Sequence, residues 1–209
     1  LLRLIAGFEC PSKGKIILVS SPGPGEGKTT TVANLAITYA NMGKKTLLID
    51  SDLRKPVMHK MFTNDKNIGF TSFLSAQESN LDNLIYSSGL ENLSILSSGI
   101  IPPNPSELLS SKEMDKFVSE VKNKFDIILF DTPPLIAVTD AFVVSKYVDK
   151  FLLVIRESVT QKGALERSLV NMDNIDTKLT GVIFNGVDET NTYGGGYYYN
   201  YYQDYYGKE

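Results

Sequence analysis

A glycine-rich loop carries the residues of this chain whose chemistry is easiest to predict. Residues 16–19 are a continuous apolar run, which is typical of a fully buried strand. Beyond the loop, apolar residues recur at helical spacing until Gly43, a plausible C-terminal stop. Strand, glycine loop, Lys-Thr and helix together form the context that a phosphate-binding P-loop requires. The loop is therefore predicted to bind the phosphates of a nucleotide.

Each part of the loop has a predicted role in that binding. Backbone N–H groups turn inward around an anion, and the N-terminus of the following helix adds a partial positive charge. Lys28 is predicted to reach the β- and γ-phosphates, and the Thr29 hydroxyl to ligate Mg²⁺. The predicted nucleotide-binding residues of the loop are Gly23, Pro24, Gly25, Glu26, Gly27, Lys28, Thr29 and Thr30.

The strict pattern G-x-x-x-x-G-K-[ST] fails at Pro22, which leaves two other interpretations of the loop. In a dinucleotide-binding loop, Gly23-x-Gly25 would follow the strand and Asp50 would lie about 20 residues beyond it. That pattern places its third glycine at Lys28, where lysine cannot replace a glycine needed for close packing. The loop could also be a plain glycine-rich turn with a solvated lysine. The P-loop is favoured over both.

Asp50, Asp52 and Asp131 lie at or just beyond the ends of apolar runs, so each is expected at the carboxyl edge of a sheet. Asp131 has the Walker B arrangement, and it is predicted to hold Mg²⁺ through water together with Asp52. Asp50 is the candidate general base. Arg54 is a further candidate catalytic residue that could face the phosphates or pair with these acids, and a surface salt bridge remains an alternative. Taken singly, each acid could be a helix cap or a turn residue.

The elements that must position these residues alternate along the chain. Apolar runs separated by helical patterns predict a mostly parallel sheet with helices on both faces, a P-loop NTPase-like α/β fold whose ligands bind at the carboxyl ends of the strands. A proline loop is expected at residues 99–106, and Ser110 with Glu113 has the spacing of a capping box. The predicted strands after the first are residues 46–49, 93–96, 126–130, 151–155 and 180–184.

Composition excludes several classes of protein. The formal net charge of −3 argues against nucleic-acid binding, which needs a basic face. No apolar run approaches the about 18 residues of a membrane span. One cysteine and one histidine make an internal disulfide impossible and a zinc site improbable. The 209 residues predict one domain over residues 1–185, in which residues 1–14 read as the end of a helix that starts upstream.

Residues 186–209 are predicted to be a flexible tail rich in glycine and tyrosine. Eight of the chain's 11 tyrosines lie there without an apolar pattern that would bury them. Beside a phosphoryl-transfer site, such a segment is best interpreted as a substrate, although a sticky aromatic tail is the alternative. The candidate phosphate acceptors are Tyr193, Tyr197, Tyr198, Tyr199, Tyr201, Tyr202, Tyr205 and Tyr206.

Four motifs in this order resemble those of the bacterial tyrosine kinases (BY-kinases). The segments are residues 20–29, 47–56, 102–109 and 127–134, and the three that concern nucleotide match Walker A, Walker A′ and Walker B. The resemblance implies autophosphorylation of the tail with ATP and Mg²⁺, in the regulation of capsule and exopolysaccharide synthesis. The acceptor is the chain's own tail or that of a neighbour, and transfer in trans is the expectation. The resemblance also implies a transmembrane activator, fused or separate, tyrosine substrates, a phosphatase, and a place at the inner face of the bacterial plasma membrane.

The resemblance extends to partition and division-site ATPases, which makes a nucleotide-dependent switch the rival function. Those ATPases carry a signature lysine where this chain has Gly23, and their adenine-contacting asparagine corresponds to Asn185. A non-enzymatic ATP sensor would leave Asp50 and Asp52 without a role. BY-kinases form a ring of subunits through Glu-x-x-Arg-x-x-Arg, of which only Arg3 can match here, so an oligomer is expected with an incomplete N-terminal contact.

Overall fold

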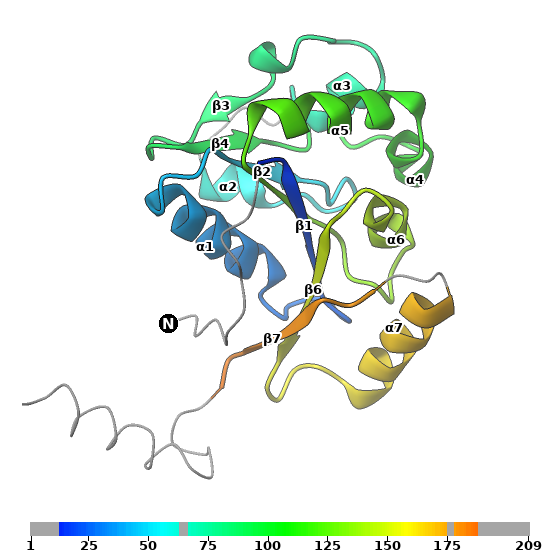
Figure 1. Cartoon of the computed structure of the whole chain (residues 1–209). Helices are drawn as coiled ribbons and strands as arrows, with labels where there is room; N and C mark the ends of the chain where they lie inside the picture. Colours follow the sequence, from blue (N-terminus) through cyan, green and yellow to red (C-terminus); the bar gives the residue numbers. More distant parts are fainter. Residues whose placement is uncertain (1–12, 63–66, 175–177, 188–209) are drawn as a thin grey trace, which may run out of the picture.

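A seven-stranded sheet, ordered β3-β4-β2-β5-β1-β6-β7, forms the centre of the molecule (Figure 1). The computed structural model describes residues 13–62, 67–174 and 178–187. All neighbouring strands are parallel except β3, which runs antiparallel to β4 at one edge. The strands are β1 (Lys15–Ser20), β2 (Thr46–Asp50), β3 (Tyr86–Ser87), β4 (Leu93–Leu96), β5 (Ile127–Asp131), β6 (Lys150–Arg156) and β7 (Gly181–Asn185).

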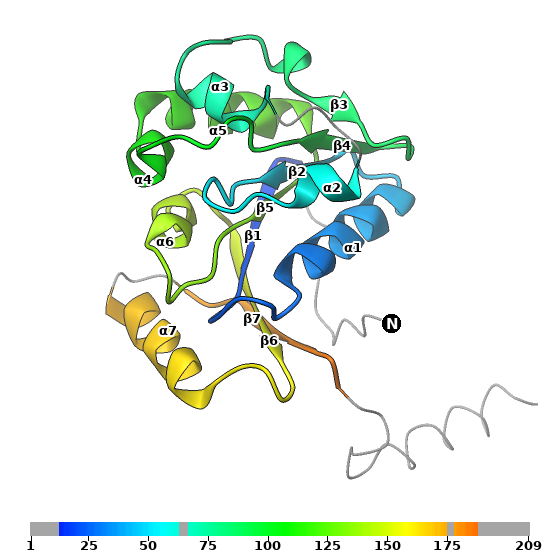
Figure 2. The same ribbon diagram turned by 180° about the vertical axis from the view of Figure 1, so that it is seen from behind.

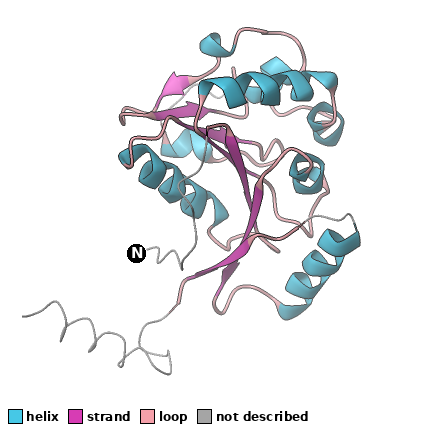
Figure 3. Ribbon diagram, in the orientation of Figure 1, coloured by secondary structure: helices cyan, strands magenta, loops and turns pink. Residues whose placement is uncertain are grey.

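Helices cover both faces of this sheet, as Figures 2 and 3 show. The longer α1 and the short α2 pack on one face, and the remaining helices pack on the other. The helices are α1 (Lys28–Asn41), α2 (Met58–Met61), α3 (Phe70–Leu74), α4 (Pro105–Leu109), α5 (Lys112–Lys124), α6 (Asp140–Ser145) and α7 (Lys162–Asn174). The predicted α/β fold, with a mostly parallel sheet between two helical layers, is confirmed.

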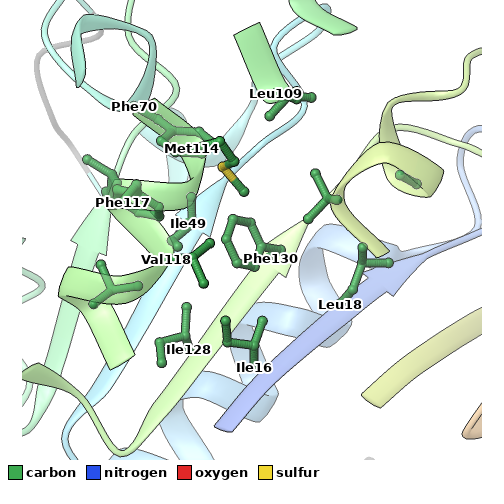
Figure 4. Packing of buried hydrophobic residues seen from close by; sticks show 14 of the residues in the cluster. Ile16, Leu18, Ile49, Phe70, Leu109, Met114, Phe117, Val118, Ile128 and Phe130 are labelled. Carbon is green, nitrogen blue, oxygen red and sulfur yellow. The ribbon is translucent and has the colours of Figure 1, made fainter. Parts of the chain in front are cut away.

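The core divides in two because successive strand residues point to opposite faces. In β1, Ile17 and Val19 join the cluster under α1, while Ile16 and Leu18 join the cluster under α5 and α6. Figure 4 shows the second cluster, where Phe130 of β5 faces aromatic residues of α3 and α5. The rings of Phe70 and Phe117 have centroids 4.7 Å apart, a distance that favours tilted aromatic packing.

The sheet order brings the predicted site residues to one edge. β1, which leads into the glycine loop, pairs with β5 on one side, and β5 pairs in turn with β2. Val19 and Asp50 both lie opposite Asp131 in the register of these pairs. Because all three strands run in parallel, the glycine loop and the acids that follow β2 and β5 meet at the same carboxyl edge.

One local prediction was wrong, one extended two residues too far, and one lies mostly outside the described residues. The expected proline loop ends earlier, since α4 begins at Pro105, where proline at the first helical position is favourable. α5 is capped by Ser111, whose hydroxyl accepts the N–H of Met114 at 3.3 Å, while Ser110 ends α4. Residues 1–12 are not described, and Lys13 and Gly14 form a turn. In the described ranges, no helix is long and apolar enough to cross a membrane.

Candidate active site

The glycine loop between β1 and α1 has the shape of an anion-binding nest. Gly25 and Gly27 adopt positive φ angles of 77° and 88°, a backbone conformation that favours glycine. α1 begins directly after the loop, with the N–H of Thr31 bonded to the Gly27 carbonyl. Across the described part of the chain, no hydrogen bond uses the amide N–H groups of residues 25–30 as donors. These groups can therefore bind the phosphates of a nucleotide.

Lys28 and the strand-end acids form one buried cluster. The Nζ of Lys28 lies 3.4 Å from Oδ1 of Asp131 and 3.6 Å from Oδ2 of Asp52. The Thr29 hydroxyl donates a hydrogen bond of 2.6 Å to Oδ2 of Asp131. Asp131 is fully buried and Asp52 is 5% exposed, so the lysine offsets charges that water cannot solvate. The structure thus brings together residues from α1, from β5 and from the loop that follows β2.

This cluster offers the ligands that Mg²⁺ prefers. Mg²⁺ is usually bound by one or two carboxylates, with water and substrate phosphates completing its coordination. Thr29 and Asp131 present a hydroxyl and a carboxylate side by side, and Oδ2 of Asp52 faces the same lysine. In the described residues no group of three or more acidic, histidine or cysteine side chains could hold a metal by itself. The donor set fits a Mg²⁺ that arrives with a nucleotide.

Asp50 is fully buried, as Asp131 is, and its carboxylate is held by backbone amides. Its Oδ1 accepts the N–H of Asp52 at 3.3 Å, and its Oδ2 accepts the N–H of Met58 at 3.0 Å. Burial, with the nearby charge of Asp131 as the second cause, raises the pKa of Asp50 to about 7. Burial also raises the pKa of Asp131, against the opposing effects of Lys28 and Thr29. A carboxylate with a pKa near neutrality suits a general base.

Comparisons with known proteins agree with this geometry. A family described as "AAA domain" matches residues 14–180. Tyrosine-protein kinase YwqD of Bacillus subtilis is 42% identical over 172 residues, which cover 82% of this chain and 72% of YwqD. The chain belongs to the bacterial tyrosine kinase family. It is a protein-tyrosine kinase.

Solved structures give the same family. The kinase domain of Escherichia coli tyrosine kinase ETK has a TM-score of 0.79 and 32% identity, covering 83% of this kinase and 68% of that chain. The chimerical protein CapA2B2 has a TM-score of 0.80 and 35% identity, covering 84% of this kinase and 77% of that chain. The MinC:MinD cell division complex of Aquifex aeolicus, at 23% identity and a TM-score of 0.71, shares the fold. Because the relatives at 32–42% identity are named as tyrosine kinases, the rival function of a switch ATPase is not favoured.

In this kinase, Arg54 pairs with an acid that the sequence did not single out. Its guanidinium donates to both carboxylate oxygens of the buried Asp140, at 2.8 and 3.1 Å. Ser106 joins them by donating to Asp140 at 2.6 Å and accepting from Arg54 at 3.2 Å. Arg54 thus ties the loop after β2 to α4 and α6. Ser106 lies within the motif of residues 102–109, but neither it nor Asp140 has the strand-end position that revealed the other acids, so no sequence pattern paired them with Arg54.

Contacts from the ends of β6 and β7 also reach the P-loop. Asn185 donates its side-chain amide to the Glu26 carbonyl at 3.0 Å, and Arg156 donates to the Gly25 carbonyl at 3.2 Å. The carboxylate of Glu26 is buried and accepts the N–H of Gly23 at 3.0 Å. Asn185 therefore touches the loop where an adenine contact was predicted, and Arg156 was missed. Its place at the end of a strand that reaches the same edge was the available signal.

The buried charge of Asp50 leads to a prediction about stability in the absence of nucleotide and metal. The pKa of Asp50 is higher in the folded kinase than in the unfolded chain, so the folded state binds this proton more tightly. Between a pH of about 4 and about 7 the unfolded chain loses this proton while the folded kinase largely keeps it, so the free energy of unfolding falls as the pH rises, on the order of 1–3 kcal/mol. Urea unfolding across this range should give a flatter curve for Asp50→Asn, which cannot titrate. Identical curves for the two proteins would contradict the buried charge.

Proposed function

We propose that this kinase transfers the γ-phosphoryl group of ATP to tyrosines of its own C-terminal cluster, acting in trans. The supporting observation is the meeting of a P-loop lysine, a Thr29–Asp131 pair and two further acids at one sheet edge. The acceptors are eight tail tyrosines, all outside the described residues. The tail, residues 186–209, follows a kinase domain that we assign to residues 1–185.

Each residue of the cluster has a proposed role in the transfer. Lys28 and the free amides of residues 25–30 bind the phosphates, and Thr29, Asp52 and Asp131 would hold Mg²⁺. When bound, Mg²⁺ supplies charge neutralisation for the phosphates. Asp50 accepts the proton of the tyrosine hydroxyl, whose ordinary pKa of about 10 leaves it protonated at neutral pH. Most of the rate enhancement is expected from positioning and charge, as in other phosphoryl transfers.

Arg54 contributes by position in this proposal. Its side chain is directed to Asp140 and Ser106, so in this structure it borders the acid cluster through its backbone, which donates to Asp52 at 3.3 Å. Arg54 would therefore keep the loop carrying Asp52 in place. That loop also carries Lys55, whose N–H donates to the same oxygen of Asp52 at 2.9 Å.

The resemblance to BY-kinases supports the wider setting that we propose. The kinase would act at the inner face of the bacterial plasma membrane with a transmembrane activator, and a phosphatase would reset the tail. Capsule or exopolysaccharide synthesis would be the regulated process. A ring of subunits would place the tail of one subunit beside the P-loop of the next, which is why we propose transfer in trans.

Mixing two full-length forms tests the donor, the acceptor and the direction of transfer. The acceptor is the Lys28→Met chain carrying an affinity tag that shifts its size, and the donor is the untagged wild type. With Mg²⁺ and ATP, we expect phosphotyrosine on both bands of a blot, because the variant keeps its tail but lacks the phosphate-binding lysine. The variant incubated alone is the control, and it should remain unlabelled.

The other outcomes of the mixture separate the alternatives. Phosphotyrosine on the wild-type band alone would indicate transfer within one chain. Release of ADP without any phosphotyrosine would support the switch ATPase instead. When all eight tail tyrosines are replaced by phenylalanine in both chains of the mixture, the label should disappear from both bands. A label that persists would locate the acceptor elsewhere.

A further inference from the structure

Two side chains from neighbouring strand ends hold consecutive carbonyl groups of the P-loop. Arg156, the last residue of β6, donates through Nη1 to the carbonyl oxygen of Gly25 at 3.2 Å. Asn185, the last residue of β7, donates through Nδ2 to the carbonyl oxygen of Glu26 at 3.0 Å. The two strands are paired, and Arg156 and Asn185 lie opposite each other in their register. The pair therefore acts on the loop from one direction.

The backbone around this pair leaves room for it. A Cβ atom on Gly27 would collide with the side-chain amide of Asn185. A Cβ atom on Gly186, whose φ is 66°, would lie 3.1 Å from Cγ and Nε of Arg156. Asn185 is also fixed on its other side, because its Oδ1 accepts the N–H of Gly186 at 2.9 Å. Both donors are thus held in place by close backbone contacts.

Holding a carbonyl group also orients the amide that follows it. In a trans peptide plane, the C=O and the next N–H point in opposite directions. The Arg156 contact therefore directs the N–H of Glu26 away from β6, and the Asn185 contact directs the N–H of Gly27 away from β7. Both amides belong to residues 25–30, whose N–H groups no hydrogen bond occupies in the described part of the chain. They are the groups available to an anion.

The side chain of Glu26 adds a third tie inside the loop. Its buried carboxylate accepts the N–H of Gly23, so that amide is already used and is not available to a phosphate. The loop thus has an internal hydrogen bond at Gly23 and accepts hydrogen bonds from Arg156 and Asn185 at the carbonyl groups of Gly25 and Glu26. Preorganised donors of this kind improve binding because they need little reorganisation when the ligand arrives.

We propose that Arg156 and Asn185 are positioning residues that orient the P-loop amides toward the phosphates of the nucleotide. This inference rests on the proposed binding of a nucleoside triphosphate at the P-loop and adds to it. Asn185 then affects affinity by orienting the loop amides that bind the phosphates. Its effect on affinity should therefore be the same whatever base the nucleotide carries. Arg156 contributes through its hydrogen bond rather than through its charge.

A ligand without a base distinguishes this role from an adenine contact. The probes are Mg²⁺·ATP and Mg²⁺·tripolyphosphate, with dissociation constants measured by calorimetry on the full chain. Asn185→Ala and Arg156→Met each remove one hydrogen bond to the loop, and each is expected to weaken both ligands by the same factor, about threefold to tenfold. Arg156→Gln keeps a neutral donor and should bind more tightly than Arg156→Met. Arg167→Gln removes a positive charge from an exposed position of α7 and is the matched control, expected to bind as the wild type does.

The remaining outcomes overturn the inference in different ways. If Asn185→Ala weakens ATP but not tripolyphosphate, Asn185 contacts the base. If Arg156→Gln and Arg156→Met lose affinity equally, and the loss shrinks in high salt, the charge of Arg156 acts directly on the ligand. If Asn185→Ala and Arg156→Met bind both ligands as tightly as the wild type does, the loop is oriented without these two side chains, and the inference is wrong. A wild type that binds neither ligand would contradict the proposed function itself, and thermal unfolding of each variant shows whether its fold is intact.

Discussion

Asp50→Asn is expected to slow phosphoryl transfer to tyrosine by about 10²–10⁴-fold while ATP binding changes little. The substitution keeps the size of the side chain and removes its ability to take a proton. Among the described residues, Asp50 forms no hydrogen bond or ion pair with Lys28 or Thr29, and asparagine keeps the Oδ1 that accepts from Asp52. The substitution should therefore spare the groups that bind phosphate and metal. Single-turnover measurements at saturating Mg²⁺·ATP isolate the chemical step.

Asp131→Asn is the matched comparison for Asp50→Asn. It removes the carboxylate that accepts from Thr29 and lies beside Lys28, so its defect should appear in metal dependence. A higher Mg²⁺ concentration should recover part of the activity of Asp131→Asn and none of the activity lost in Asp50→Asn. If Mg²⁺ restores Asp50→Asn instead, the base lies elsewhere, and Asp52 is the next candidate.

The acid cluster could be predicted because acids placed at the ends of apolar runs combine two strong sequence signals. Apolar runs without alternation mark buried parallel strands, and parallel strands bring their carboxyl ends to one edge. Asp50, Asp52 and Asp131 needed no other information to be placed together. The P-loop was equally readable, since glycine spacing, Lys28 and Thr29 specify a local backbone shape.

Contacts between segments that are distant in sequence had no comparable signal. Asp140 follows no apolar strand, and its partner Arg54 lies 86 residues away, so only the packing of α6 against the loop after β2 pairs them. The predicted cap of α5 was wrong for a local reason. Ser110 and Ser111 are adjacent and either could cap a helix, but Ser110 follows the last residue of α4, so Ser111 caps α5. Sequence patterns predict which elements form, whereas the pairing of side chains depends on how those elements pack.

The structure also alters what is expected of Lys28. A P-loop lysine that contacted only the phosphates of the ligand could be removed without changing the stability of the fold. In the kinase it is largely buried between Asp52 and Asp131, two carboxylates that water does not solvate. Removing the lysine leaves those charges without a counter-charge, which is a destabilising change.

Lys28→Met is therefore expected to abolish autophosphorylation and also to lower the free energy of unfolding by about 1–3 kcal/mol at neutral pH. The activity is lost because no cation then reaches the phosphates, and the stability is lost because the Asp131 charge is left to Thr29 alone. Adding Asp131→Asn to Lys28→Met should restore much of the stability and none of the activity, since it removes the uncompensated charge. Urea unfolding and phosphotyrosine blots of the four proteins in this cycle measure both effects. Phosphotyrosine at wild-type levels in Lys28→Met would contradict the P-loop role of the lysine, and additive losses of stability in the double variant would contradict its pairing with Asp131.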